Sequence, residues 1–169
     1  MIRRYLHLLY TACGYAAAGF LAMIAVLTLA QVVARQLGIP LESIELAGFC
    51  LAASTFLGLA HTFVNGGHVR VAMLSNALPK AGRRWLEAWC CLVGLGASGY
   101  AAWHMAGFTW ETYIYGDLSP GLAAMPLWIP QSGVAAGLAV LAVGFAEQLA
   151  VVLTGGTPDY VLHGGSGHE

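Results

Sequence analysis

Four long apolar stretches constrain the fold of this chain more than any other feature, because each is free of charged residues through its centre. They run from about Ala12 to Val33, from Glu45 to Val64, from Trp85 to Tyr113 and from Pro130 to Leu153. A helix needs about 20 apolar residues to cross the ~30 Å hydrocarbon core of a bilayer. The sequence therefore predicts an all-α integral membrane protein with four transmembrane helices.

The composition agrees with this interpretation. Of the 169 residues, 59% are hydrophobic and only 9% are charged, whereas soluble domains carry roughly 25% charged residues. The formal net charge is -1, so no basic surface predicts a nucleic-acid partner. We expect a single membrane domain over residues 1–154 and a flexible, glycine-rich tail over residues 155–169. Arg3 and Arg4 resemble the start of a signal peptide, but the apolar stretch after them exceeds the usual 7–15 residues, which predicts a retained span.

The distribution of Lys and Arg predicts the orientation. Basic residues precede the first span and lie between the second and third spans, namely Arg3, Arg4, Arg70, Lys80, Arg83 and Arg84. Cytoplasmic connections carry the excess of Lys and Arg in membrane proteins. Both termini and the second connection are therefore predicted to be cytoplasmic.

The second connection has a helical pattern of its own. Val71, Leu74 and Leu78 repeat at helical spacing between Arg70 and Lys80, and Pro79 would end the helix. This spacing is typical of a short amphipathic helix at the membrane interface, between the second and third spans. A plain loop is the alternative.

Aromatic residues and prolines mark the third connection. Trp110, Tyr113, Tyr115 and Trp128 are typical of an interfacial aromatic belt. Pro126 and Pro130 bracket Trp128, and Pro130 suits the first turn of a helix, where no N–H is needed. Gly133 and Gly137 then form a G-x-x-x-G motif, which favours close helix packing in lipid but does not identify the facing helix.

Nothing in the sequence predicts an enzyme. No phosphate-binding glycine loop, nucleophile elbow or H-E-x-x-H motif occurs, and the four cysteines lack metal-binding spacing. We therefore predict no catalytic residue, metal site or cofactor. A haem-binding membrane anchor of an oxidoreductase is the alternative, because His61 and His104 lie in adjacent spans. Their predicted depths differ by roughly 20 Å, too far for one haem. A small autonomous channel or exporter is a third hypothesis.

Three short motifs occur in order along the chain. Arg35 ends the first span and Glu45 opens the second, the run Gly66–Val71 (GGHVRV) follows the second, and Pro126–Pro130 (PLWIP) opens the fourth. In this order and on four spans, they resemble the small membrane subunit of tripartite ATP-independent periplasmic (TRAP) transporters, the DctQ-type family. The resemblance extends from about Arg4 to Leu153.

The resemblance implies a function and a set of partners. Such a subunit is a scaffold in the bacterial inner membrane beside a large multi-span subunit, which carries the solute and sodium sites. A periplasmic solute-binding protein delivers an organic acid for secondary active transport by symport. Membrane lipids are the remaining partner. Seven residues are candidates for a partner or lipid interface, with ordinary interfacial anchoring as the alternative: Arg35, Glu45, His68, Arg70, Pro126, Trp128 and Pro130.

Overall fold

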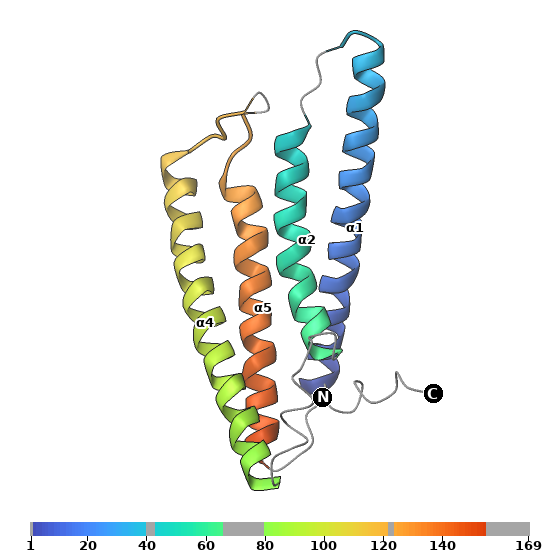
Figure 1. The fold of residues 1–169 in the computed structure, drawn as a ribbon. Helices are drawn as coiled ribbons and strands as arrows, with labels where there is room; N and C mark the ends of the chain where they lie inside the picture. The colour runs from blue at the N-terminus through green and yellow to red at the C-terminus, as the bar shows by residue number, and fades with distance from the viewer. Residues whose placement is uncertain (1, 40–42, 66–79, 122–123, 155–169) are drawn as a thin grey trace, which may run out of the picture.

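The structure, a computed structural model, describes residues 2–39, 43–65, 80–121 and 124–154. These residues form four long helices: α1 (Ile2–Gln36), α2 (Ile44–Val64), α4 (Lys80–Tyr115) and α5 (Trp128–Leu153) (Figure 1). Each helix contains one of the four predicted spans. The all-α prediction is confirmed, since the described residues hold no strand beyond an isolated bridge between Leu118 and Pro126.

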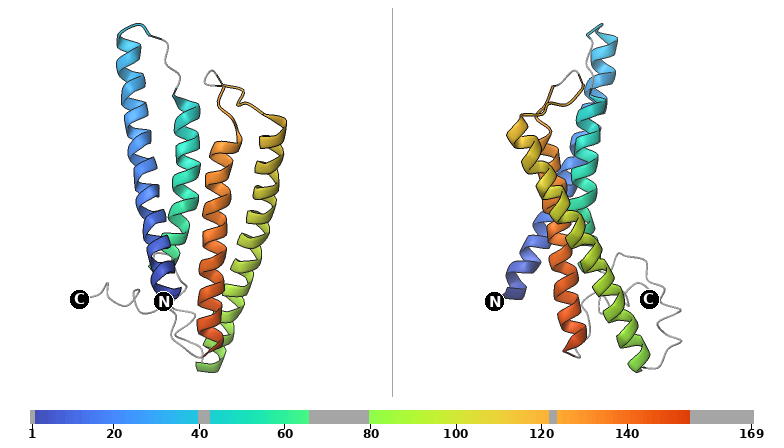
Figure 2. Two further views of the ribbon diagram at one scale, coloured as in Figure 1. Left: turned by 180° about the vertical axis from the view of Figure 1, so that it is seen from behind. Right: turned by 90° about the vertical axis from the view of Figure 1, so that its left-hand side faces the viewer.

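The four helices stand side by side in a row, in the order α1, α2, α5, α4. Extensive contacts join α1 to α2, α2 to α5 and α5 to α4. The edge-on view in Figure 2 shows a thin, twisted layer in which α1 and α4 incline in opposite directions. The helices run roughly lengthwise between two edges of the layer. We call the edge where α1 begins the basal end, and the edge where α1 finishes and α5 begins the apical end. No other described element covers either broad face of the layer.

The helices differ in length and hydropathy. Three stretches are long and apolar enough to cross a membrane, Tyr5–Gln36, Ile44–Val64 and Trp128–Leu153. Helix α4 has 36 residues, or about 54 Å at 1.5 Å per residue, but glycines and residues such as Trp103 and His104 lower its average hydropathy. The structure thus supports four long helices with three membrane-compatible ones, and the fourth span stays a prediction.

The seam between α2 and α5 depends on the two glycines of the G-x-x-x-G motif. A Cβ added to Gly137 would lie 2.6 Å from the carbonyl carbon of Phe56, so the two backbones are in direct contact. At Gly133 an added Cβ would lie 3.5 Å from the Cβ of Ala53, an ordinary contact distance. The motif therefore faces α2 within this chain.

The seam between α1 and α2 combines small residues with side-chain hydrogen bonds to backbone. The buried Ser54 hydroxyl donates to the carbonyl oxygen of Ala17 at 3.0 Å. Nearer the basal end, the His61 ring packs on Gly14, where an added Cβ would lie 2.8 Å from the ring. Small residues allow this close approach of the backbones. Close packing is important here because lipid supplies little hydrophobic driving force for the association of helices.

The Phe145 ring fills part of the seam between α4 and α5, and hydrogen bonds connect the two helices near both ends. A Cβ added to Gly94 of α4 would lie 2.5 Å from the Phe145 ring of α5. The Thr112 hydroxyl donates to Gln131 Oε1 at 2.6 Å near the apical end, and Arg84 binds the last carbonyls of α5 at the basal end. The main apolar core lies in the basal half, around Tyr10, Ala60, Phe63, Val64, Cys91 and Leu141.

Two predicted segments lie outside the described residues. One is the amphipathic helix between the second and third spans, within residues 66–79, and the other is the C-terminal tail, residues 155–169.

Candidate interface at the apical end

Five of the seven candidate residues lie near the apical end of the row. Arg35 is in the last turn of α1, Glu45 is in the first turn of α2, and Pro126, Trp128 and Pro130 surround the start of α5. The other two, His68 and Arg70, lie outside the described residues.

The described residues of the 117–127 connection between α4 and α5 form a hairpin. The Ser119 N–H donates to the carbonyl oxygen of Met125 at 2.9 Å, and the Leu127 N–H donates to that of Asp117 at 3.1 Å. Ala124 has a φ of 43°, a left-handed conformation that costs a non-glycine residue about 1 kcal/mol or more. Backbone bonds across the hairpin hold this residue in place.

The hairpin approaches α2 at Glu45. The Glu45 carboxylate lies so close to the α-carbon of Gly121 that no Cβ fits between them. The buried Ser119 hydroxyl accepts a hydrogen bond from the Gly121 N–H at 3.4 Å. Gly121 therefore lets the hairpin rest on the first turn of α2, and a carboxylate is favourable at that position because of the helix dipole.

Arg35 is exposed at the end of α1 and is not brought together with Glu45. Helix α1 ends at Gln36 and is followed by Gly38 with a φ of 72°, and the Ile39 N–H donates to the carbonyl oxygen of Ala34 at 2.9 Å. This is a glycine-terminated helix end, where a basic residue in the last turn interacts favourably with the dipole. Among the residues that the structure describes, no ion pair joins Arg35 to Glu45. The contact partner of Glu45 is Gly121.

The two prolines have distinct positions around the start of α5. Pro126 forms the bridge with Leu118, on the hairpin side. Pro130 is the third residue of α5, in the first turn, where backbone N–H groups have no partner within the helix. Its place in the first turn confirms the prediction from sequence.

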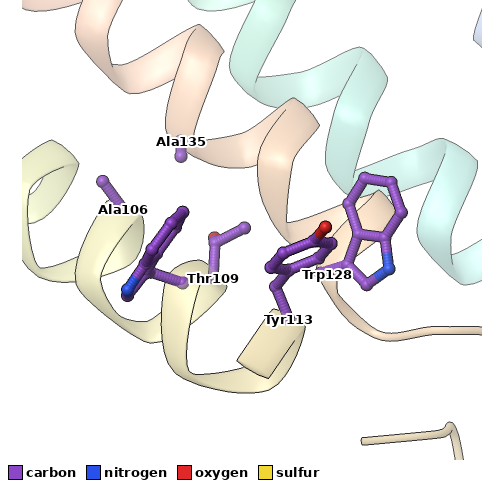
Figure 3. Close-up of a pocket in the computed structure, with 6 residues that line it drawn as sticks. Ala106, Thr109, Tyr113, Trp128 and Ala135 are labelled. Atoms are coloured by element: carbon purple, nitrogen blue, oxygen red, sulfur yellow. The ribbon is translucent and has the colours of Figure 1, made fainter. Parts of the chain in front are cut away.

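An aromatic groove opens between α4 and α5 beside this helix start (Figure 3). It encloses about 500 Å³ and is mostly apolar, with six lining residues: Ala106, Thr109, Trp110, Tyr113, Trp128 and Ala135. The Tyr113 and Trp128 rings meet edge to face, with centroids 5.6 Å apart, and the Trp110 ring lies 6.0 Å from that of Tyr113. Ala106 and Ala135 are too small to close the space.

Side chains of this groove are available to another molecule. Trp110 and Tyr113 are 64% and 58% exposed, although each ring has a large apolar surface that is costly to leave in water. Aromatic residues with an apolar body and a polar tip are typical both of membrane interfaces and of protein interfaces. The groove fits an apolar occupant better than a charged solute.

The structure also reveals a polar cluster at the basal end that the motifs did not indicate. The hydroxyl of Tyr10 donates to Glu147 Oε2 at 3.0 Å, and His61 Nδ1 lies 3.1 Å from the Tyr10 carbonyl oxygen. Tyr10 is 2% exposed and the neighbouring Gln148 is fully buried. The cluster joins α1, α2 and α5. Intramembrane polar residues were the only sequence signal for it, because the partners are far apart in the chain.

The two histidines of the haem hypothesis lie on helices that are not neighbours in the row. His61 is on α2, where its ring faces Gly14 and the Tyr10 carbonyl. His104 is exposed on α4, and its ring lies 4.3 Å from that of Tyr100. Because α5 stands between α2 and α4 in the row (Figure 1), the arrangement does not support a haem bound by both.

A protein-family model matches most of the chain. The model described as "Tripartite ATP-independent periplasmic transporters, DctQ component" matches residues 24–155. The match covers most of the chain and includes the last part of α1, all of α2, α4 and α5, and the apical hairpin. No curated protein sequence matches the chain significantly.

Proposed function

Because the chain belongs to the DctQ family of tripartite ATP-independent periplasmic transporters, we propose that it is the small, non-catalytic scaffold subunit of such a transporter. Its partners in this proposal are a large multi-span membrane subunit, which carries the solute and the coupling ion, and a periplasmic solute-binding protein. The complex resides in the bacterial inner membrane and takes up an organic acid by ion-coupled symport.

The single-layer arrangement is the structural observation that carries the proposal. Only 6% of the most apolar stretch of α1 is buried, compared with 28% for α2 and 33% for α5. A layer with two open faces exposes large apolar areas, which lipid or a larger membrane protein can cover. This architecture suits a subunit that supports another one.

The polar groups of the described helices support the same proposal. Tyr10 with Glu147, Ser54 with Ala17, and Thr112 with Gln131 each bridge two helices. These bonds hold the layer together at different heights. The basal cluster does bring Tyr10, His61 and Glu147 together, but its hydrogen bonds join the helices to one another, whereas a solute or ion site would direct several polar groups into a cavity.

We further propose that all four helices cross the bilayer, with the basal end cytoplasmic. The length of α4, the position of Arg84 near its start and the aromatic residues near its end support this arrangement. The seven candidate residues then divide between the two interfaces, with the five apical ones on the periplasmic side and His68 and Arg70 on the cytoplasmic side.

The apical aromatic groove is the proposed contact with the large subunit. Its apolar lining would receive apolar side chains from that subunit, and the hairpin above it would face the binding protein. A photoreactive residue in place of Ala106, which lines the groove, should cross-link to the large subunit in membranes. The same residue in place of Ala146, an exposed position in the basal half of α5, is the matched control.

Uptake measurements test the function itself. Cells that express the large subunit and the binding protein should accumulate the solute only when this chain is also present. The purified chain alone, in proteoliposomes, should carry no flux. Uptake that persists without the chain, or flux through the chain alone, would overturn the proposal.

A further inference from the structure

A second cavity lies at the opposite end of the same helix pair. It is a notch of about 390 Å³ at the basal end, between the start of α4 and the end of α5. Five residues line it: Arg84, Trp85, Ala88, Val152 and Leu153. Ala88 lies one turn after Arg84 on the same side of α4, and its side chain is too small to fill the notch.

The guanidinium of Arg84 is fixed at the mouth of the notch. Its Nε donates to the carbonyl oxygen of Val152 at 3.0 Å, and its Nη2 donates to that of Leu153 at 2.6 Å. These bonds use two of the five N–H donors of a guanidinium, and the side chain remains exposed. Among the described residues no carboxylate forms an ion pair with it. Arg84 thus presents oriented donors and a positive charge at this site.

An apolar stripe continues from the notch along α4. Trp85, Trp89 and Leu92 repeat at helical spacing and are 79%, 64% and 50% exposed. Tryptophan is typical of the interfacial region, and the leucine lies deeper along the helix. Along α4, the cation of Arg84 is therefore followed by two indoles and then by the aliphatic Leu92. This order matches the parts of a phospholipid, from the charged headgroup to the acyl chain.

The excess of basic residues in the sequence at the start of α4 favours an anionic headgroup. Lys80, Arg83 and Arg84 carry three positive charges within five residues, and Glu87 is the one acidic residue that follows in the next turn. A guanidinium binds phosphate oxygens through parallel hydrogen bonds. An anionic headgroup gains from the neighbouring positive charges as well, whereas a zwitterionic one offsets them with its own ammonium group.

We propose that this notch binds the phosphodiester headgroup of an anionic phospholipid, with Arg84 as the phosphate ligand and one acyl chain along Trp89 and Leu92. The inference rests on the part of the proposed function that places α4 across the bilayer with its start at an interface. A lipid bound here would cover the basal end of the α4–α5 seam, at the opposite end from the aromatic groove.

Lipid titration of the purified full-length chain tests the inference. The probe is phosphatidylglycerol, added in detergent and counted by native mass spectrometry, with phosphatidylcholine as the zwitterionic comparison. We expect phosphatidylglycerol to bind at least about fivefold more tightly, the ratio that corresponds to about 1 kcal/mol for one basic residue near an anionic lipid. Equal binding of the two lipids would overturn the inference.

Three variants locate the site. Ala88→Leu fills the notch but leaves both hydrogen bonds of Arg84 in place, so it should remove the preference for phosphatidylglycerol. Ala97→Leu adds the same side chain at an exposed position further along α4 and should bind like the wild type. Arg84→Lys keeps the charge but loses the parallel hydrogen bonds, so it should give an intermediate preference. An unchanged preference in Ala88→Leu would contradict the proposed site.

Free anions and transport give the remaining controls. Inorganic phosphate at millimolar concentration should not displace the lipid, because the acyl chain contributes to binding. Displacement by phosphate would show a simple anion site and overturn the inference. The binding assay needs no partner subunit, whereas the uptake assay needs all of them. If the wild-type chain shows no preference for phosphatidylglycerol while uptake is intact, this inference alone is refuted. If the preference is present but uptake does not depend on the chain, the proposed function alone is refuted.

Discussion

Gly137 of α5 packs directly against the backbone of Phe56 on α2, so closely that an added Cβ would lie 2.6 Å from the Phe56 carbonyl carbon. Among the described glycines of α2 and α5, this is the tightest approach between the two helices, and it joins the α1–α2 pair to the α5–α4 pair. The nearby Gly133 has an ordinary neighbour at 3.5 Å. The two glycines of one motif therefore have different tolerance for a side chain.

Substitution of the two glycines should separate these roles. Gly137→Ala forces the backbones of α2 and α5 apart and should destabilise the chain by about 1–3 kcal/mol, the usual cost of overpacking. Gly133→Ala should be neutral or slightly stabilising, since alanine favours a helix by about 1 kcal/mol over glycine. Thermal unfolding of the purified variants in detergent measures both effects. Equal stability of the two variants would contradict the described seam.

The Tyr10–Glu147 hydrogen bond should stabilise the junction of α1 with α5. Tyr10→Phe removes the donor and leaves the carboxylate oxygen without it, so we expect a loss of about 0.5–2 kcal/mol. Tyr15→Phe is the matched control on the same helix, because Tyr15 is 76% exposed and should tolerate the change. Unfolding by a graded increase of denaturing detergent compares the two, and a Tyr10→Phe variant as stable as Tyr15→Phe would argue against the bond.

The contact between Gly121 and Glu45 should be sensitive to a single methyl group. Gly121→Ala places a Cβ where the Glu45 carboxylate lies, so the hairpin or the side chain must move. We expect a cysteine introduced at Leu118, which is 57% exposed, to change its labelling rate in the Gly121→Ala variant. Combining Gly121→Ala with Glu45→Ala removes the clash and should restore the original rate. Failure of the double variant to do so would place the cause elsewhere.

Reporter fusions test whether α4 crosses the bilayer. A periplasmic reporter fused after Gly121 should be active, and the same reporter fused after Ala81 should be inactive, because Arg83 and Arg84 favour the cytoplasmic side. Activity at both positions, or inactivity at both, would mean that α4 does not span. The reversed pattern would overturn the predicted orientation while leaving α4 as a span.

The sequence predicted the helices more completely than their arrangement. Continuous apolar stretches identify helices because every backbone polar group in lipid must be satisfied within the segment, and Pro130 correctly marked the start of α5. The order of the row was not predictable, since the glycines of the G-x-x-x-G motif fit any close neighbour. Hydropathy distinguishes α4 from the other three helices, because glycine, tryptophan and histidine lower the average hydropathy of α4 without adding charge.

The apical site illustrates the same limit for single residues. Glu45 and Arg35 are only ten positions apart in the sequence, yet the carboxylate of Glu45 lies against Gly121. That contact depends on the fold of the 117–127 hairpin, including the left-handed backbone at Ala124, which no side-chain pattern indicates. Likewise Tyr10 and Glu147 are 137 positions apart, and only the packing of α1, α2 and α5 brings them together.

The order α1, α2, α5, α4 has a consequence for assembly during synthesis. Each outer helix pairs with the helix next to it in the chain, so two helical hairpins can form from local contacts as they leave the ribosome, and local contacts form quickly. The α2–α5 seam, together with the Tyr10–Glu147 bond and the Gly121–Glu45 contact, then joins the halves after sideways diffusion in the membrane. A chain cut within residues 66–79 and produced as two fragments should therefore reconstitute the whole layer.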